Sequence, residues 1–504
     1  MTQSFRLLKD LLARLSKKEV VSLKKKITLN LDAKDERRIK SLHVVNLILN
    51  NPELSELQTH RELYSPLNKV AFLKLIERII EKIDEVYISF IKDIGPFYSE
   101  RNFYFFYLKR KLLVLQMRWL RGIDFDLGMQ FEKIISLSKK YELYDCLIEA
   151  LLAKQRFVGF RQGKKAFDKI ENDILKYEAN RKALQRARSL FTMLSTKFNQ
   201  SNSPNEYKKE LEATILLLKQ DYDLTKSNTV GYYLFYLETE LLNMNEKFEV
   251  AENTLNKLLD LVVNNPSVYT RTRHGDIVAN LSSNELYLGN FDEAVKNAVY
   301  AKSFYEKKSL PLDVAKEVEF FARFYKGELD IAAKIIDEIY YSSLKNNIPF
   351  LSSKRAYLYA CIATMKGEIE KSNQLLQEVN EIVKNKGGWN LGKRILTIIN
   401  CIEAGDYESA DLKVLSLEKF VKRISKSHHI RKRDVIILRI LLKLINEGFD
   451  FDSVYKKRRR YFDLLESKDP DYCWKIKSPE LIVFHEWFKK KLKKNKIARE
   501  LKTA

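Results

Sequence analysis

A short helix-breaking turn recurs at nearly constant spacing through the middle of this 504-residue chain. Its copies begin at Gly289, Gly327, Gly367 and Gly405, and a diverged copy without glycine begins at Glu246. The steps between successive copies are 43, 38, 40 and 38 residues. Recurrence at such a period is typical of a solenoid, in which each repeat is a helical hairpin that packs on its neighbours.

The residues that follow each turn line one helical face. Counted from the second residue after the start of the turn, apolar or small residues recur along about four helical turns. The residue three places into this helix is always alanine or serine, and a small side chain there lets the two helices of a hairpin approach closely. The residues that define the clearest four repeats are Gly289, Phe291, Ala294, Gly327, Leu329, Ala332, Gly367, Ile369, Ser372, Gly405, Tyr407 and Ala410.

Two of these repeats carry a family resemblance. Asn280-Leu281-Ser282, followed by the turn Gly289–Ala294, resembles the tetratricopeptide repeat (TPR), whose first helix carries N-L-G and whose turn reads G-D-Y-D-E-A. Gly405–Ala410 matches that turn again. The likeness is clearest over residues 240–425 and looser over 97–470, with a period of about 40 residues in place of 34. It implies a right-handed α-α superhelix whose concave groove binds a protein or peptide.

Some positions depart from the family pattern. Phe320 and Ile398 stand where the first helix of a TPR carries a small residue. The peptide-clamping residues of the family therefore cannot be transferred to this chain. The opening Leu15–Glu19 is similar to the start of uncharacterised bacterial proteins with such repeats.

The chain is expected to be all-α, in three parts. Residues 1–95 lack the repeat and are predicted to form an N-terminal helical domain or cap. Residues 96–470 form the TPR-like solenoid, and residues 471–504 form a basic C-terminal capping helix and tail. Only 15 glycines and 9 prolines occur, which favours long helices.

The N-terminal part contains two local signals. Ser16 and Glu19 form a capping-box pattern, which predicts the start of a helix. A long helix is expected between Asn68 and Ile91. Its apolar side is predicted to comprise Val70, Leu73, Ile76, Ile80, Ile83 and Tyr87.

No catalytic motif is present in the sequence. It contains no glycine-rich phosphate loop, no GxSxG elbow and no HExxH pair. The adjacent pair His428-His429 is poorly placed for one metal, because neighbouring residues of a helix point about 100° apart. We expect no enzyme activity, no catalytic residue, no cofactor and no metal site.

The cysteines and the N-terminus indicate a cytoplasmic protein. Cys146, Cys361, Cys401 and Cys473 lie far apart, which argues against a disulfide framework. The first residues carry charges every few positions and do not resemble a secretory signal. No apolar run approaches the roughly 20 residues that span a bilayer. The basic tail could contact a membrane surface through Trp487, Phe488, Leu492 and Ile497, but this apolar face is short, so membrane binding is not expected.

The formal net charge of +23 is concentrated at the two ends of the chain. Residues 1–50 carry +7, residues 419–504 carry +14, and the rest carries +2. Eight cations near the C-terminus are candidate contacts to phosphate or to an acidic partner: Lys456, Lys457, Arg459, Arg460, Lys489, Lys490, Lys493 and Lys494.

Two interpretations of this basic end stay open. The nearby rings of Tyr455, Tyr461, Trp474 and Trp487 could stack on nucleic-acid bases. Alternatively, the rings form the core of the last hairpin and the lysines give the solenoid the polar end that it needs. The leading hypothesis for the whole chain is a non-catalytic scaffold or adaptor that binds a protein or peptide in the groove. The alternative is an RNA- or DNA-associated helical-repeat protein that uses its basic ends.

Overall fold

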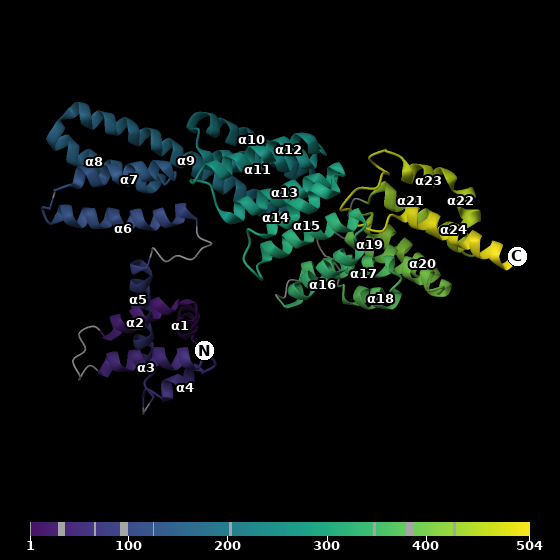
Figure 1. Cartoon of the computed structure of the whole chain (residues 1–504), viewed down its shortest axis with the longest axis horizontal. Coiled ribbons are helices and arrows are strands. Elements are labelled where there is room, and N and C mark those ends of the chain that lie inside the picture. Colours follow the sequence, from purple (N-terminus) through teal and green to yellow (C-terminus); the bar gives the residue numbers. More distant parts are fainter. Residues whose placement is uncertain are drawn as a thin grey trace. The chain divides into compact units, whose positions relative to one another are not determined.

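The structure is a computed structural model, and it describes residues 2–28, 36–64, 67–90, 99–123, 125–200, 204–345, 349–379, 388–426 and 430–503. Regular secondary structure in these residues consists of the helices α1 to α24, without strands (Figure 1). The predicted all-α class is therefore confirmed. Among the same residues, no helix combines the length and the apolar character that crossing a bilayer requires. The contacts divide the chain into two compact units, Met1–Glu178 and Ala179–Ala504.

The first unit contains α1 to α8 and the start of α9. Their bounds are α1 (Gln3–Arg14), α2 (Lys17–Thr28), α3 (Glu36–Asn50), α4 (Glu56–Arg61), α5 (Lys69–Ser89), α6 (Glu100–Leu120), α7 (Leu127–Lys140) and α8 (Tyr144–Gln162). Helices α1, α2, α3 and α5 share one apolar core, to which Leu63, after the end of α4, also belongs. The expected capping box at the start of α2 is confirmed, because the Ser16 N–H donates to Glu19 Oε2 at 2.7 Å and the Glu19 N–H donates to Ser16 Oγ at 3.3 Å.

The buried face of α5 differs from the predicted one. Ile76 and Ile83 are buried as expected, but Val70 is 65% exposed. The buried side consists of Phe72, Leu75, Ile76, Ile79, Ile83 and Val86. Apolar residues occupy two adjoining faces of this helix, and packing against α1, α2 and α3 selects between them. The selected face contains Phe72, whose ring centroid lies 6.1 Å from that of Phe5.

The second unit is a solenoid of helical hairpins in which consecutive helices pack on each other. The division between the units falls inside α9 (Lys164–Gln200), which α10 (Pro204–Thr225) follows. The hairpins are α11 (Asn228–Met244) with α12 (Phe248–Asn264), α13 (Arg271–Leu288) with α14 (Phe291–Lys302), α15 (Leu310–Lys326) with α16 (Leu329–Lys345), α17 (Pro349–Met365) with α18 (Ile369–Glu378), and α19 (Trp389–Glu403) with α20 (Tyr407–Ile424). They are followed by α21 (Lys432–Asn446), α22 (Phe451–Lys457), α23 (Arg459–Glu466) and α24 (Phe484–Thr503).

The turns inside the hairpins share one backbone geometry. Gly289 has φ +82°, a left-handed conformation that a residue with a Cβ atom adopts only at a cost. The N–H of the next residue, Asn290, then donates to the Glu285 carbonyl at 2.9 Å and closes the end of α13. The diverged turn is equivalent, since Glu246 has φ +57° and the Lys247 N–H donates to the Leu242 carbonyl at 2.9 Å.

The small residue three places into the second helix of each hairpin lies at the centre of the packing. Ala251, Ala294, Ala332, Ser372 and Ala410 are all fully buried. Where serine replaces alanine, its hydroxyl accepts a hydrogen bond from Asn400 Nδ2 at 2.8 Å. The buried polar group is therefore satisfied, and α18 is tied to the next hairpin.

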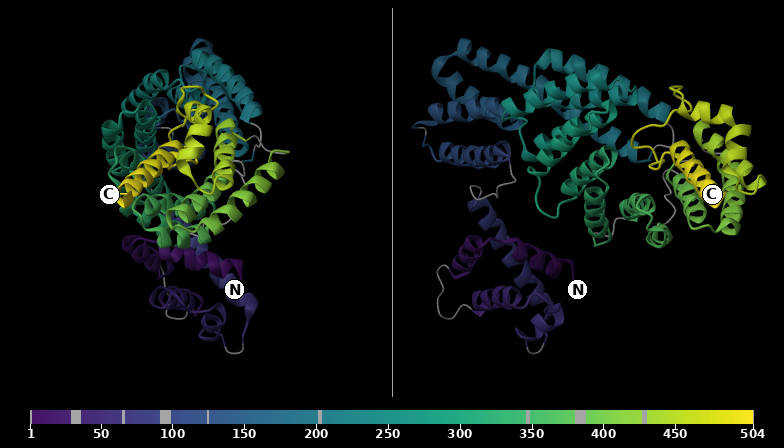
Figure 2. Two further views of the ribbon diagram at one scale, coloured as in Figure 1. Left: turned by 90° about the vertical axis from the view of Figure 1, so that its right-hand side faces the viewer. Right: turned by 45° about the vertical axis from the view of Figure 1, so that its right-hand side comes forward.

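The chain does not end with the last hairpin. Between α23 and α24 it returns to α13, α15, α17 and α19, which are the first helices of four hairpins, and to α21. We call these five helices the inner helices. We call residues Trp474–Ile482 the inner segment. Figure 2 shows the yellow C-terminal part of this unit beside its green helices.

Candidate functional site

The inner segment is a non-helical stretch of chain held by side chains of the inner helices, and it turns at residues 475–478, where the Ser478 N–H donates to the Lys475 carbonyl at 3.1 Å. The Lys477 N–H donates to Tyr325 Oη at 2.8 Å, and Tyr357 Oη donates to the Pro479 carbonyl at 2.5 Å. Leu481 is buried in the core that α15, α16 and α17 form, and Ile476 and Ile482 pack against the same core. The inner face of the solenoid therefore binds both the main chain and the apolar side chains of this segment.

One end of the inner segment is anchored by a buried ion pair. Arg433 of α21 donates from Nε and Nη2 to the two carboxylate oxygens of Glu480, at 2.6 and 2.8 Å. Its Nη1 donates to the carbonyls of Leu465 and Tyr472, at 2.9 and 2.7 Å. Both ionic side chains are almost fully buried. Bidentate geometry and further hydrogen bonds are what a buried pair needs to offset the loss of hydration.

The other end carries a lysine in unusual surroundings. Lys477 Nζ donates to Ser283 Oγ at 2.9 Å and lies over the rings of Tyr287 and Phe321, at 5.3 and 5.8 Å from their centroids. It makes no ion pair with a described residue. Loss of hydration lowers the pKa of its ammonium to about 8; the charge of Lys354 adds to this shift and Glu317 opposes it. The rings stabilise the cation only in part.

A glycine lets the inner segment approach α19 closely. A Cβ atom at Gly392 would lie 2.7 Å from the Pro479 carbonyl oxygen and 2.8 Å from Tyr357 Oη. The void that remains nearby, between inner segment and helices, measures only about 10 Å³. The segment and this part of the inner face are therefore closely complementary.

The eight predicted cations lie on the outside of the C-terminal end, and four of them are paired. Lys456 contacts Asp452 at 2.7 Å, Lys457 contacts Glu447 at 2.7 Å, Arg459 contacts Asp463 at 2.9 Å, and Lys489 contacts Glu466 at 2.6 Å. Arg460, Lys490, Lys493 and Lys494 are exposed and form no ion pair within the part of the chain that the structure describes. Four of the eight cations lie on two short helices, α22 and α23, which are divided at Arg458.

The rings near these cations take part in packing. The Tyr455 ring lies 4.9 Å from that of Phe462, and Trp487 Nε1 donates to Glu403 at 2.8 Å. Trp474 belongs to the inner segment, where its Nε1 donates to the Glu480 carbonyl at 2.8 Å. These three rings are occupied by contacts inside the fold.

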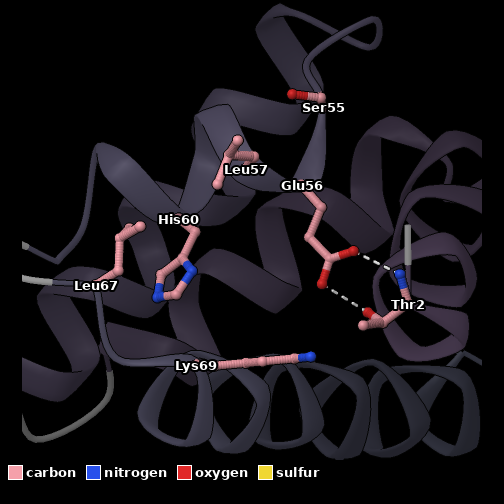
Figure 3. Close-up of a pocket in the computed structure, with 7 residues that line it drawn as sticks. All are labelled: Thr2, Ser55, Glu56, Leu57, His60, Leu67 and Lys69. Atoms are coloured by element: carbon pink, nitrogen blue, oxygen red, sulfur yellow. Dashed lines mark hydrogen bonds between the residues drawn. The ribbon is translucent and has the colours of Figure 1, made fainter.

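A separate hollow of about 660 Å³ lies in the first unit. Figure 3 shows the residues that line it: Thr2, Ser55, Glu56, Leu57, His60, Leu67 and Lys69. Thr2 donates its N–H and its hydroxyl to the Glu56 carboxylate at 2.5 and 2.8 Å, and the His60 ring stacks on Phe72 with centroids 4.6 Å apart.

The described residues contain no group of three or more histidine, cysteine or acidic side chains that could hold a metal. The pair His428-His429 lies outside the described residues. The sequence interpretation did not identify the inner segment. Its only local signal is the stretch Ile476, Pro479, Leu481 and Ile482, which is apolar, contains proline and lacks helical periodicity.

No family model and no curated protein matches the sequence. Similar solved structures include PilF of Pseudomonas aeruginosa, with 12% identity, a TM-score of 0.35, and coverage of 48% of this chain and 93% of that one. The apo form of RapI has 13% identity and a TM-score of 0.42, covering 74% of this chain and 99% of its own. A STAND signal-transduction ATPase with a tetratricopeptide-repeat sensor, from Pyrococcus horikoshii, has 10% identity and a TM-score of 0.40, covering 85% and 66%. At these identities the similarity concerns the fold alone.

Proposed function

We propose that this chain is a non-catalytic scaffold or adaptor that binds a protein or peptide partner along the inner face of its TPR-like solenoid. One observation carries the proposal: this face already holds a non-helical segment of the same chain. Tyr325 and Tyr357 bind main-chain groups of that segment, and such contacts do not depend on the side chains of the bound peptide. A partner peptide can use the same groups.

Site-specific photo-crosslinking tests this proposal. A photo-reactive phenylalanine derivative is placed at Tyr287, which is 37% exposed on α13, and in a second protein at Arg460 on the outside. Both proteins are purified from native cells after irradiation and nuclease treatment. We expect a partner protein to crosslink at Tyr287 and not at Arg460. Crosslinks only at Arg460, or none at either position, would contradict the proposal.

Nucleic-acid binding is the second candidate function. The observation in its favour is the set of exposed cations without an ion pair to a described residue, Arg460, Lys490, Lys493 and Lys494. A salt series separates the two candidates, because affinity that depends on phosphate contacts falls steeply as the salt concentration rises.

We also place the protein in the cytoplasm. Cys146, Cys361, Cys401 and Cys473 are all unpaired, and the first three are buried. Free thiols of this kind are typical of a reducing compartment. Cell fractionation followed by immunodetection tests the assignment.

A further inference from the structure

The two halves of the inner segment are held with different strength. Glu480 and Leu481 belong to the anchored half, which contains the buried ion pair with Arg433 and a core side chain. The other half, Trp474–Ser478, relies partly on an exposed ion pair between Lys475 and Glu246, and exposed pairs contribute little. Its remaining contacts to the inner helices are the hydrogen bonds of the Lys477 N–H with Tyr325 Oη and of Lys477 Nζ with Ser283, and the edge-on contact of the Trp474 and Tyr325 rings.

Lys477 weakens the half to which it belongs. Its ammonium loses hydration and contacts one hydroxyl and two ring faces instead. No carboxylate of the described residues pairs with it. The depressed pKa of this group has the same cause, loss of hydration that disfavours the charged form. Lys477 also has φ +57°, a conformation that costs a non-glycine residue free energy. This half is therefore the part of the inner segment that a competitor displaces most easily.

The inner helices beneath Trp474–Ser478 present three groups that a bound peptide would have to match. They offer Tyr325 Oη as the acceptor for a main-chain N–H, an apolar contact at the position of Ile476, and a narrow space between Tyr287 and Phe321 that ends at Ser283. A long unbranched side chain fits this space. An uncharged one enters without the loss of hydration that lysine suffers.

We propose that the face of α13 and α15 beneath Trp474–Ser478 is a binding site for a partner peptide that adopts the same turn and carries an aliphatic residue and, next to it, a long unbranched uncharged side chain such as methionine. Residues Trp474–Ser478 are then an internal occupant that this peptide displaces. The inference rests on the proposed function and specifies the chemical class of the partner.

The order of affinity follows from the site. At neutral pH a peptide with methionine at the position of Lys477 binds more tightly than one with lysine, and one with glutamate does not bind. The advantage of methionine decreases as pH rises above about 8, because the lysine of a bound peptide then loses its charge. Of the charged groups nearby, Lys354 disfavours the charge of a lysine and Glu317 favours it, and neither acts on the uncharged methionine. Burial raises the pKa of Tyr287 and Tyr325, so both rings stay neutral in this range.

Three labelled hexapeptides test the proposal on the full chain. The first has the sequence of residues 474–479, W-K-I-K-S-P, and the other two carry methionine or glutamate at the fourth position. Fluorescence anisotropy measures binding, and hydrogen exchange with mass spectrometry follows the amides of residues 475–478. At pH 7 we expect the methionine peptide to bind at least about tenfold more tightly than the lysine peptide and to raise exchange of those amides. At pH 9.5 the ratio should fall towards one.

Binding of the methionine peptide to a variant of the full chain provides a matched measurement. Lys477→Glu weakens the internal occupant, so the methionine peptide should bind this variant more tightly than it binds the parent. If circular dichroism shows that the variant is unfolded, the peptide series on the parent chain decides. Absence of binding at millimolar peptide, or equal binding of all three peptides, would overturn the inference.

Two further outcomes keep the inference and the proposed function distinct. Partner crosslinks at Tyr287 without peptide binding would overturn the inference and leave the proposed function in place. If the inner segment of a second copy occupied this face, the protein would form dimers at high concentration, and the amides of residues 475–478 would lose their protection from exchange on dilution. That outcome would also overturn the inference.

Discussion

The outer surface of α22 to α24 and the inner face of the solenoid both carry lysines, but in opposite environments. On the outside, Lys456, Lys457 and Lys489 each lie beside a carboxylate in contact with solvent. On the inside, Lys477 lies over aromatic rings with a serine hydroxyl as its polar side-chain contact. The comparison teaches that half of a dense charge cluster can be paired at the surface of the fold, whereas a single lysine outside any cluster can lie against aromatic rings without a carboxylate partner. The predictions below test this difference.

The largest effect is expected where the inner segment is anchored. Arg433→Ala leaves Glu480 buried without its partner, and we expect a loss of about 3–5 kcal/mol in the free energy of unfolding. Urea denaturation measures it. The neighbouring Lys432 pairs with Asp471 at the surface, so Lys432→Ala should leave the urea midpoint almost unchanged. Equal effects of the two substitutions would remove the distinction between inner and outer charges.

The next largest effect concerns the close approach at α19. Gly392→Ala places a methyl group 2.7 Å from the Pro479 carbonyl oxygen, and we expect a cost of about 1–3 kcal/mol from overpacking, reduced by up to about 1 kcal/mol through the better helix propensity of alanine. Amide exchange of the inner segment should accelerate. Gly128→Ala in α7 is the control, since its Cβ atom would meet Phe157 at an ordinary 3.5 Å. Unchanged exchange in Gly392→Ala would show that the inner segment is not held against α19.

The repeats could be predicted because their signals are local. A turn at Gly289 and a small residue at Ala294 are separated by five positions, and together they determine where one helix ends and how closely the next approaches. The face of α5 could not be predicted in the same way. Apolar residues lie on two of its sides, and only contacts with α1 to α3 decide which side is buried.

The position of the inner segment could not be predicted because it depends on contacts between distant parts of the chain. Lys477 and Ser283 are separated by 194 positions. No periodicity connects a non-helical segment to the helices that hold it. The division between α22 and α23 at Arg458 has no local signal either, since the run from Lys456 to Arg460 contains neither glycine nor proline.

A smaller, pH-dependent effect tests the inner lysine directly. The pKa of Lys477 is about 8 in the folded chain and about 10.4 in an unfolded one. Below pH 8 both states are protonated and the folded state bears the full cost of the charge; between these values the folded state loses its proton first and the cost declines. Lys477→Met should therefore stabilise the fold by about 1–2 kcal/mol at pH 7, and this gain should shrink towards pH 10. Denaturation at several pH values measures it, and Lys475→Met, at an exposed position, should show no such trend.

The smallest effect is expected on the outside. Charge reversal of Lys456, Lys457, Arg459 and Arg460 to glutamate removes cations whose side chains are exposed to solvent, where ion pairs are screened by water and salt. We expect these substitutions to leave both the fold and the crosslinking of a partner at Tyr287 unchanged, as circular dichroism and the crosslinked yield would show. Nucleic-acid binding predicts the reverse, because affinity for phosphate depends on such cations and falls with salt. If charge reversal abolished partner binding and a lower salt concentration restored it, the partner would bind to the outer surface and not to the inner face.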